Sequence, residues 1–92
     1  MAQVVVTLKI MPESPEIDLA AIETEAKNKI SDFSQGGDMK IEQEPIAFGL
    51  KALKVMFVMD ESKGSTDSLE ESIKSISGVN SVEVVDVRRA IG

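Results

Sequence analysis

Two pairs of neighbouring carboxylates are the residues of this chain best suited to acid–base chemistry. Glu70 and Glu71 are adjacent in a segment with helical spacing, so their side chains point in different directions. Glu42 and Glu44 are two residues apart in a strand-like segment and share one face with Lys40. Both pairs are typical of a solvated surface. The chain also lacks histidine and cysteine, so the commonest general base and a thiolate nucleophile are missing. We therefore expect a protein that is not an enzyme.

The only two arginines of the chain are neighbours, Arg88 and Arg89. A guanidinium forms forked hydrogen bonds with a carboxylate or a phosphate, which a lysine does not match. These residues either end the last strand as solubilising charges, paired with Asp86 or with other acidic groups of the chain, or contact a partner. Exposed ion pairs of the first kind contribute at most about 1 kcal/mol to stability.

An aromatic residue, Phe48, lies between small residues in the segment 45–53, PIAFGLKAL. The chain has three aromatic residues, so an aromatic at the join of two strands needs a physical reason. Small neighbours leave the ring uncovered, and Gly49 permits backbone angles that other residues avoid. Phe48 either closes one end of the core or projects into a partner, and position alone favours the core.

The periodicity of apolar residues predicts four strands and two helices. The expected strands cover 3–11, 39–47, 51–59 and 79–88. The first expected helix begins after Asp18 as N-cap and ends near residue 30. The second begins at Thr66 or Asp67, where Glu70 is placed to close a capping box with Asp67, and Gly78 is its left-handed stop.

These elements form two strand–helix–strand halves within a single domain, 1–92. Right-handed crossovers interleave the halves into an α+β, ferredoxin-like βαββαβ sandwich. Its antiparallel sheet has the order 4-1-3-2, and both helices cover one face. The second strand is then an edge, where Pro45 is tolerated although it has no N–H to donate. The other sheet face stays uncovered, with Lys54 and Met56 among its expected residues.

Composition excludes several classes of function. A net charge of −6 disfavours nucleic acid, because Lys and Arg lead binding to phosphates. No apolar run approaches the roughly 20 residues that span a bilayer, and the first residues lack the basic segment of a signal peptide. Neither Gly36-Gly37 nor Lys63-Gly64-Ser65 has the spacing of a phosphate loop. We therefore expect a soluble intracellular protein without a cofactor, a resident metal ion or a membrane contact.

Three segments together resemble archaeal translation elongation factor 1-beta. They are PIAFGLKAL at 45–53, GSTDSLEE at 64–71 and VNSVEVVDV at 79–87. The chain is also similar to the C-terminal exchange-factor domain of the eukaryotic factor. The resemblance covers nearly the whole chain, and the order and spacing of the three segments make it more specific than any one of them.

The resemblance implies a guanine-nucleotide exchange factor that promotes release of GDP and loading of GTP on the GTPase elongation factor 1-alpha. In the eukaryotic relatives the aromatic that matches Phe48 contacts the GTPase, and a lysine next to the C-terminus reaches the magnesium site of the nucleotide. This chain has Ala47 where that pattern has glycine, and it has no lysine in its last residues. Our hypothesis is that Arg88 or Arg89 contacts acidic groups of the GTPase instead.

We expect five partner-binding residues: Phe48, which the resemblance implies, together with Gly49, Arg88, Arg89 and Ile91. We expect a cytoplasmic monomer. An alternative of another class is a small-molecule-sensing regulatory domain, which this fold also hosts. A small hydrolase is disfavoured, because a nucleophile, a base and an anion-binding loop are all missing.

Overall fold

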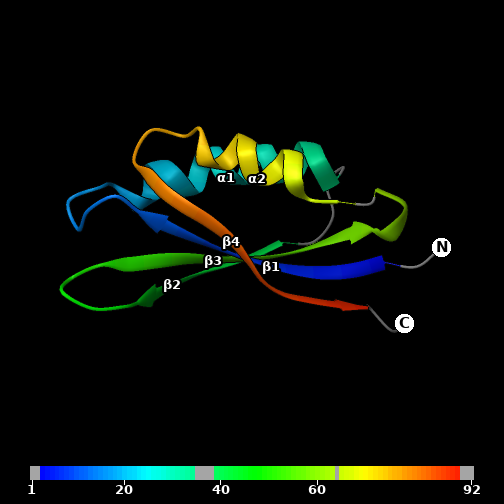
Figure 1. The fold of residues 1–92 in the computed structure, drawn as a ribbon, viewed down its shortest axis with the longest axis horizontal. Helices are drawn as coiled ribbons and strands as arrows, with labels where there is room; N and C mark the ends of the chain where they lie inside the picture. Colours follow the sequence, from blue (N-terminus) through cyan, green and yellow to red (C-terminus); the bar gives the residue numbers. More distant parts are fainter. Residues whose placement is uncertain (1–2, 35–38, 64, 90–92) are drawn as a thin grey trace.

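The computed structural model describes residues 3–34, 39–63 and 65–89, which contain four strands, two α-helices and a short 3-10 helix (Figure 1). In chain order these are β1 (Gln3–Pro12), α1 (Leu19–Ser34), β2 (Met39–Pro45), β3 (Lys51–Asp60), η1 (Glu61–Lys63), α2 (Asp67–Lys74) and β4 (Val79–Arg89). The predicted order of strands and helices is confirmed. Within the described residues, neither α-helix combines the length and the hydropathy that crossing a membrane requires.

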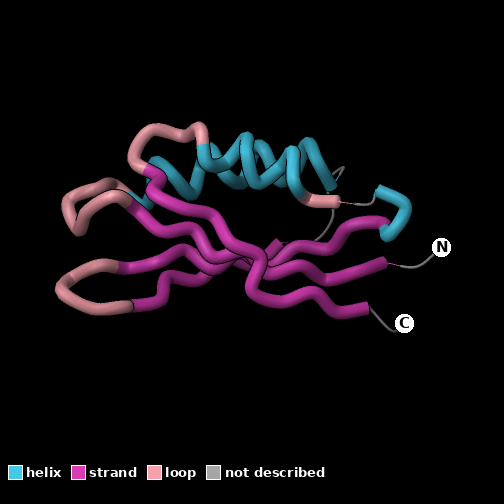
Figure 2. The backbone as a smooth tube through the Cα atoms, in the orientation of Figure 1, coloured by secondary structure: helices cyan, strands magenta, loops and turns pink. Residues whose placement is uncertain are grey.

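The sheet has the order β2-β3-β1-β4, and every neighbouring pair is antiparallel. This is the predicted order read from the opposite edge. Both α-helices cover the same face (Figures 1 and 2), so the ferredoxin-like sandwich is confirmed. β2 is an edge strand, and Pro45 lies at its end, opposite Lys51. Proline has no N–H to donate to the ladder, and an edge strand tolerates this loss.

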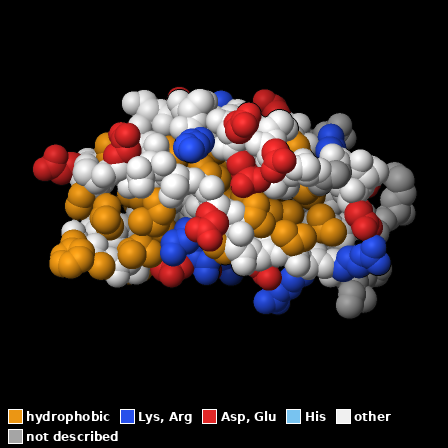
Figure 3. All heavy atoms as spheres, viewed as in Figure 1, with side chains coloured by type: hydrophobic (Ala, Val, Ile, Leu, Met, Phe, Trp, Pro, Cys, Tyr) orange, Lys and Arg blue, Asp and Glu red, His pale blue; other side chains and the backbone are white. Residues whose placement is uncertain are grey.

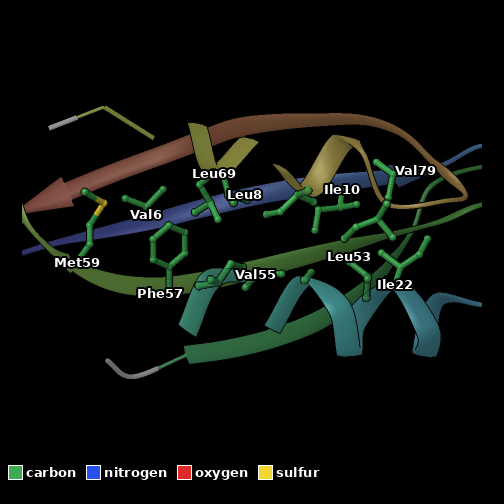
Figure 4. Close-up of a cluster of buried hydrophobic side chains, with 14 residues drawn as sticks. Val6, Leu8, Ile10, Ile22, Leu53, Val55, Phe57, Met59, Leu69 and Val79 are labelled. Carbon is green, nitrogen blue, oxygen red and sulfur yellow. The ribbon is translucent and has the colours of Figure 1, made fainter. Parts of the chain in front are cut away.

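Alternation along the two central strands builds the core between the sheet and the helices (Figure 4). Apolar side chains on the helix-covered face are buried, while α1 and α2 close the layer from above. The fully or almost fully buried set includes Val6, Leu8 and Ile10 of β1, Leu53, Val55 and Phe57 of β3, Ile22, Ala26 and Ile30 of α1, and Leu69 and Ile73 of α2. The core therefore rests mainly on aliphatic residues, as the composition predicts.

The helix boundaries differ from the sequence prediction in two places. α1 continues to Ser34 rather than ending near residue 30. Phe33 explains the extra turn, because its ring packs edge-on against Phe57 with the centroids 6.5 Å apart. At the start of α2 the carboxylate of Glu70 accepts a hydrogen bond from the hydroxyl of Thr66 at 2.9 Å, so the predicted box with Asp67 is wrong.

Of two other local predictions, one holds in full and one in part. The backbone N–H of Ala20 donates to Oδ1 of Asp18 at 3.0 Å, which confirms the N-cap of α1. Gly78 has the predicted left-handed conformation, with a φ of +94°, but it is not the stop of the helix. α2 ends at Lys74 with Ser75 as its C-cap, so Gly78 lies in the turn that leads into β4. Its backbone C=O accepts a hydrogen bond from the N–H of Glu13 at 2.9 Å, so this turn also holds the loop that follows β1.

Replacing Gly78 with alanine should destabilise the fold. An added Cβ would lie 2.9 Å from Cγ2 of Ile17, and an L-residue at this φ costs about 1–2 kcal/mol before any clash. We expect a lower urea midpoint in equilibrium unfolding followed by circular dichroism. The neighbouring exposed residue Ser77 offers the control, because Ser77→Ala changes no backbone requirement. Equal midpoints for the two variants would contradict the strain argument.

One irregularity in β4 changes which face its side chains occupy. The pairing with β1 shifts between Thr7 and Leu8, whose partners are Asp86 and Val84, so Val85 is an extra residue in β4. Before this bulge Val84 lies on the helix-covered face with Leu8. After it, Val87 lies on that face, because it pairs with Val6. The alternation of β4 is therefore out of phase on the two sides of Val85.

Candidate functional site

Phe48 lies at the tip of the hairpin that joins β2 to β3. The two strands remain paired up to Pro45 and Lys51, and the chain reverses within the next few residues. The side chain of Phe48 is 96% exposed, the largest exposed fraction among the large hydrophobic residues described as exposed. This exposure excludes the interpretation that Phe48 closes the end of the core. Phe57 and Phe33 fill that role at the opposite end of the sheet.

The backbone of this turn is unusual at both central residues. The N–H of Leu50 donates to the C=O of Ala47 at 2.9 Å, and between them Phe48 has a φ of +53° and Gly49 a φ of +79°. Positive φ at both central positions is what the mirror-image type I′ turn requires, and Asn-Gly is its preferred sequence. Phe48 is the one residue other than glycine with positive φ among those described. A bulky side chain therefore occupies a position where local stability favours Asn or Gly.

The surroundings of Phe48 form an apolar end of the molecule. Ile46 is 40% exposed, and Pro45 and Ala47 are also exposed. Figure 3 shows hydrophobic side chains gathered at the end of the molecule where β2 and β3 are joined. Gly49 lies against the loop between β1 and α1, since a Cβ built on it would be 3.7 Å from Cβ of Pro15. A hollow of about 400 Å³ separates this loop from the hairpin. We name the residues Pro45–Gly49 the hairpin tip.

Arg88 and Arg89 lie at the end of β4, on opposite faces of the sheet. Arg88 pairs with Val5 in the ladder and Arg89 with Val4. Nε of Arg88 is 2.8 Å from a carboxylate oxygen of Asp86, and Nη2 of Arg89 is 2.8 Å from Oε1 of Glu61.

Both intramolecular pairs match one of the alternatives left open by the sequence. All four side chains are well exposed, so each pair adds at most about 1 kcal/mol and can be exchanged for a partner's carboxylate.

The tertiary structure separates the hairpin tip from the arginines. β3 runs from Lys51, beside the hairpin tip, to Met59, which faces Val4, the ladder partner of Arg89. At 3.3–3.4 Å per residue this path is about 27 Å long. The two groups lie at opposite ends of a molecule whose long axis is 42 Å (Figure 1). Ile91, the fifth expected contact residue, lies outside the described residues.

Glu42 and Glu44, one of the two carboxylate pairs noted in the sequence, form ion pairs with lysines. Glu42 lies 3.4 Å from Nζ of Lys40, and Glu44 lies 3.3 Å from Nζ of Lys54; all four side chains are more than a third exposed. The two ion pairs lie on the uncovered sheet face, so the predicted solvated surface is confirmed for Glu42 and Glu44.

One carboxyl group elsewhere has a shifted pKa. Ser62 lowers the pKa of Asp60, because its backbone N–H donates to Oδ1 at 2.8 Å and stabilises the charged form. Asp60 thereby fixes the start of η1.

Comparison with protein families decides the relationship of the chain. The model of the EF-1 guanine nucleotide exchange domain matches residues 5–90. The chain belongs to the EF-1 guanine nucleotide exchange domain family. The resemblance found in the three segments of the sequence is thereby confirmed, and the matched range includes the hairpin tip and both arginines.

Curated relatives in the same family come from methanogenic archaea and carry the name elongation factor 1-beta. The relative from Methanothermobacter thermautotrophicus is 49% identical over 90 residues, which cover 97% of this chain and 98% of the relative. The relative from Methanobrevibacter smithii is 45% identical, and that from Methanosphaera stadtmanae is 48% identical; each alignment covers 97% of this chain and 98% of the relative.

Solved structures similar to this member of the exchange domain family support its fold alone. The de novo designed protein Foldit4 superposes with a TM-score of 0.64 at 19% identity, over 98% of both chains. The C-terminal domain of the MgtC protein from Mycobacterium tuberculosis gives a TM-score of 0.52 at 16% identity, over 98% of this chain and 88% of that one.

Proposed function

We propose that this protein is a translation elongation factor that promotes release of GDP from the GTPase elongation factor 1-alpha, after which GTP binds. It acts by non-covalent binding, as a cytoplasmic monomer. The observation that carries the proposal is the ring of Phe48, which is 96% exposed on a turn with positive φ, within a chain of the exchange domain family. Strained, exposed side chains of this kind occur at binding sites, where the rest of the fold keeps them in place.

Exchange requires a protein that binds the nucleotide-free GTPase more tightly than the GDP-bound form. Linkage then makes the exchange factor weaken GDP binding by the same factor. A thousandfold weakening corresponds to about 4 kcal/mol. Burial of one phenylalanine contributes about 1.5–3 kcal/mol, so Phe48 and one charged contact are sufficient in magnitude. No nucleophile, base or metal ion is needed for such a mechanism.

The distance between the hairpin tip and the arginines suits a partner that is bound at two separate places. We infer that the hairpin tip anchors the GTPase at one end of the sheet, while Arg88 or Arg89 contacts acidic groups about 27 Å away along the strands. The continuous ladders of β1 and β3 hold the two ends at a constant separation. Binding energy gained at the tip can therefore be used to place the arginines.

Both edges of the sheet carry features that oppose pairing with a second sheet, which supports a monomer. β2 ends in Pro45 and alternates charged residues, namely Lys40, Glu42 and Glu44. β4 is interrupted by the bulge at Val85. Proline, charges and bulges are the usual means by which edge strands avoid edge-to-edge association.

Release of fluorescent GDP from elongation factor 1-alpha tests the proposed function. We expect micromolar concentrations of this protein to accelerate release by at least about tenfold, as the linkage of nucleotide and factor binding requires. An unrelated GTPase loaded with the same nucleotide is the control and should be unaffected. If release from elongation factor 1-alpha is not accelerated, the proposed function is wrong.

A further inference from the structure

Val87 is an exposed apolar residue that the proposed function does not use. It is 58% exposed, second only to Phe48 among the large hydrophobic residues described as exposed. The two lie at opposite ends of the sheet, because Val87 pairs with Val6 near the start of β1, whereas Phe48 follows the end of β2. Each end of the molecule thus presents one prominent apolar side chain.

Val87 lines a hollow of about 360 Å³ between the sheet and the start of α2, which we name the arginine-end groove. Its apolar part comes from Val4, Val6, Met59 and Val87, and its polar side from Glu61, Ser65 and Thr66. The groove lies where β1 and β4 extend past the first turn of α2, so that among the described residues no α-helix covers this end of the sheet (Figure 1). Hydrophobic side chains are visible there between the helix layer and β4 (Figure 3).

Of the two arginines, Arg89 lies beside this groove, because it pairs with Glu61, which lines it. Val87 pairs with Val6, and Arg89 pairs with Val4. Both partners line the groove on the helix-covered face of the sheet. Arg88 pairs with Val5 and lies on the uncovered face, near the lysines and glutamates that pair with one another there. The bulge at Val85 produces this arrangement, because it moves the side chains of Val87 and Arg89 onto the groove side.

The charges at the groove indicate the chemistry of its occupant. Only Nη2 of Arg89 is engaged by Glu61, at 2.8 Å, and a guanidinium has five N–H donors in all. Arg89 can therefore donate hydrogen bonds to a second carboxylate as well as to Glu61. That carboxylate would lie next to the apolar residues of the groove. A segment with an aliphatic side chain adjacent to a carboxylate matches both features.

We propose that the arginine-end groove binds such a segment of the GTPase, with the aliphatic side chain against Val87 and the carboxylate on Arg89. This inference rests on the proposed function and adds to it the direction from which the partner binds. The GTPase approaches this end of the sheet from the helix-covered side, and Arg89 contributes more to binding than Arg88 does. Val87 and Arg89 determine how tightly this end is held.

Val87→Thr tests the groove, because it keeps the shape of the side chain and replaces one methyl group by a hydroxyl. We expect the concentration of this protein that half-saturates GDP release to rise about three- to tenfold. The melting temperature should not change, since the side chain is largely exposed and threonine suits a strand. The conservative variant Val87→Ile should stay within about twofold of the natural protein.

Val85→Thr is the matched control, because Val85 is 43% exposed in the same strand but on the opposite face. There it lines a separate hollow on the uncovered face of the sheet. It should leave half-saturation unchanged. Arg89→Gln should raise the half-saturating concentration more than Arg88→Gln does. The inference is overturned if Val87→Thr has no effect, if Val85→Thr has the larger effect, or if Arg88→Gln matches or exceeds Arg89→Gln. If the natural protein does not accelerate release of GDP from the GTPase, the proposed function is wrong. The inference about the groove, which rests on it, is then wrong as well.

Discussion

Phe48→Ala should slow GDP release from elongation factor 1-alpha by at least about tenfold, because loss of an anchor that buries a phenylalanine costs about 1.5–3 kcal/mol of binding. The fold should be unaffected, since the ring is 96% exposed and touches none of the buried core. The measurements are stopped-flow release of labelled GDP and a thermal melt of each protein. Large truncations in the core destabilise a protein by 2–5 kcal/mol, and no such loss is expected here.

Phe48→Asn separates anchoring from folding. Asn is the preferred residue before glycine in a turn with positive φ, so this variant should unfold at a higher temperature than the natural protein. It should nevertheless lose exchange activity to the same extent as Phe48→Ala. A stabilised protein without activity would show that the turn retains phenylalanine for binding, at some cost in stability. Full activity of either variant would refute the anchor.

Replacing both arginines, as Arg88→Gln with Arg89→Gln, should slow exchange by about tenfold or more at low salt, because charge-assisted hydrogen bonds contribute about 1.5–3 kcal/mol each. The defect should shrink as salt rises, since salt weakens the same contacts in the natural protein. Release of GDP measured across a series of ionic strengths provides the test. The intramolecular pairs with Asp86 and Glu61 are exposed, so their loss should leave the melting temperature nearly unchanged.

Lys27→Gln is the matched control for the arginines. Lys27 forms a similar surface pair, 3.9 Å from Glu23 along α1, but it lies in the helix layer away from the end of β4. It removes one positive charge without touching the proposed contact, so its effect is compared with that of Arg88→Gln or Arg89→Gln alone. Equal effects of the lysine and arginine substitutions would mean that net charge alone is responsible. Substitution is also cleaner than deletion of residues 88–92, because Arg88 and Arg89 are paired with β1 and deletion would shorten the ladder.

Much of the fold could be predicted from local patterns. The alternation of Val6, Leu8 and Ile10 specifies which face of β1 is buried, because successive side chains of a strand point to opposite faces. Pro45 identifies an edge strand through its missing N–H, and Gly78 identifies a left-handed turn through its permitted φ. These features depend on the covalent chemistry of single residues and on periods of a few residues.

Two predictions at helix ends failed for different reasons. α1 extends to Ser34 because Phe33 meets Phe57 across the core, which is a contact between distant segments. The box at α2 fails locally, because Glu70 bonds to Thr66, four residues earlier, and not to Asp67. For Val87, the sequence contained a usable signal. Val82 and Val84 are in one phase of alternation, whereas Val85 and Val87 are in the other, and such a change of phase indicates a bulge.

The sequence by itself determined the family, the order of the elements and the residues able to serve as contacts, because these follow from local spacing and from residue types. It left open whether Phe48 is covered and which way each arginine points. Only the tertiary structure decided these questions, since exposure and face depend on where strands far apart in the chain pair. Those pairings place Phe48 at one end of the sheet and Arg88 and Arg89 at the other, with one arginine on each face.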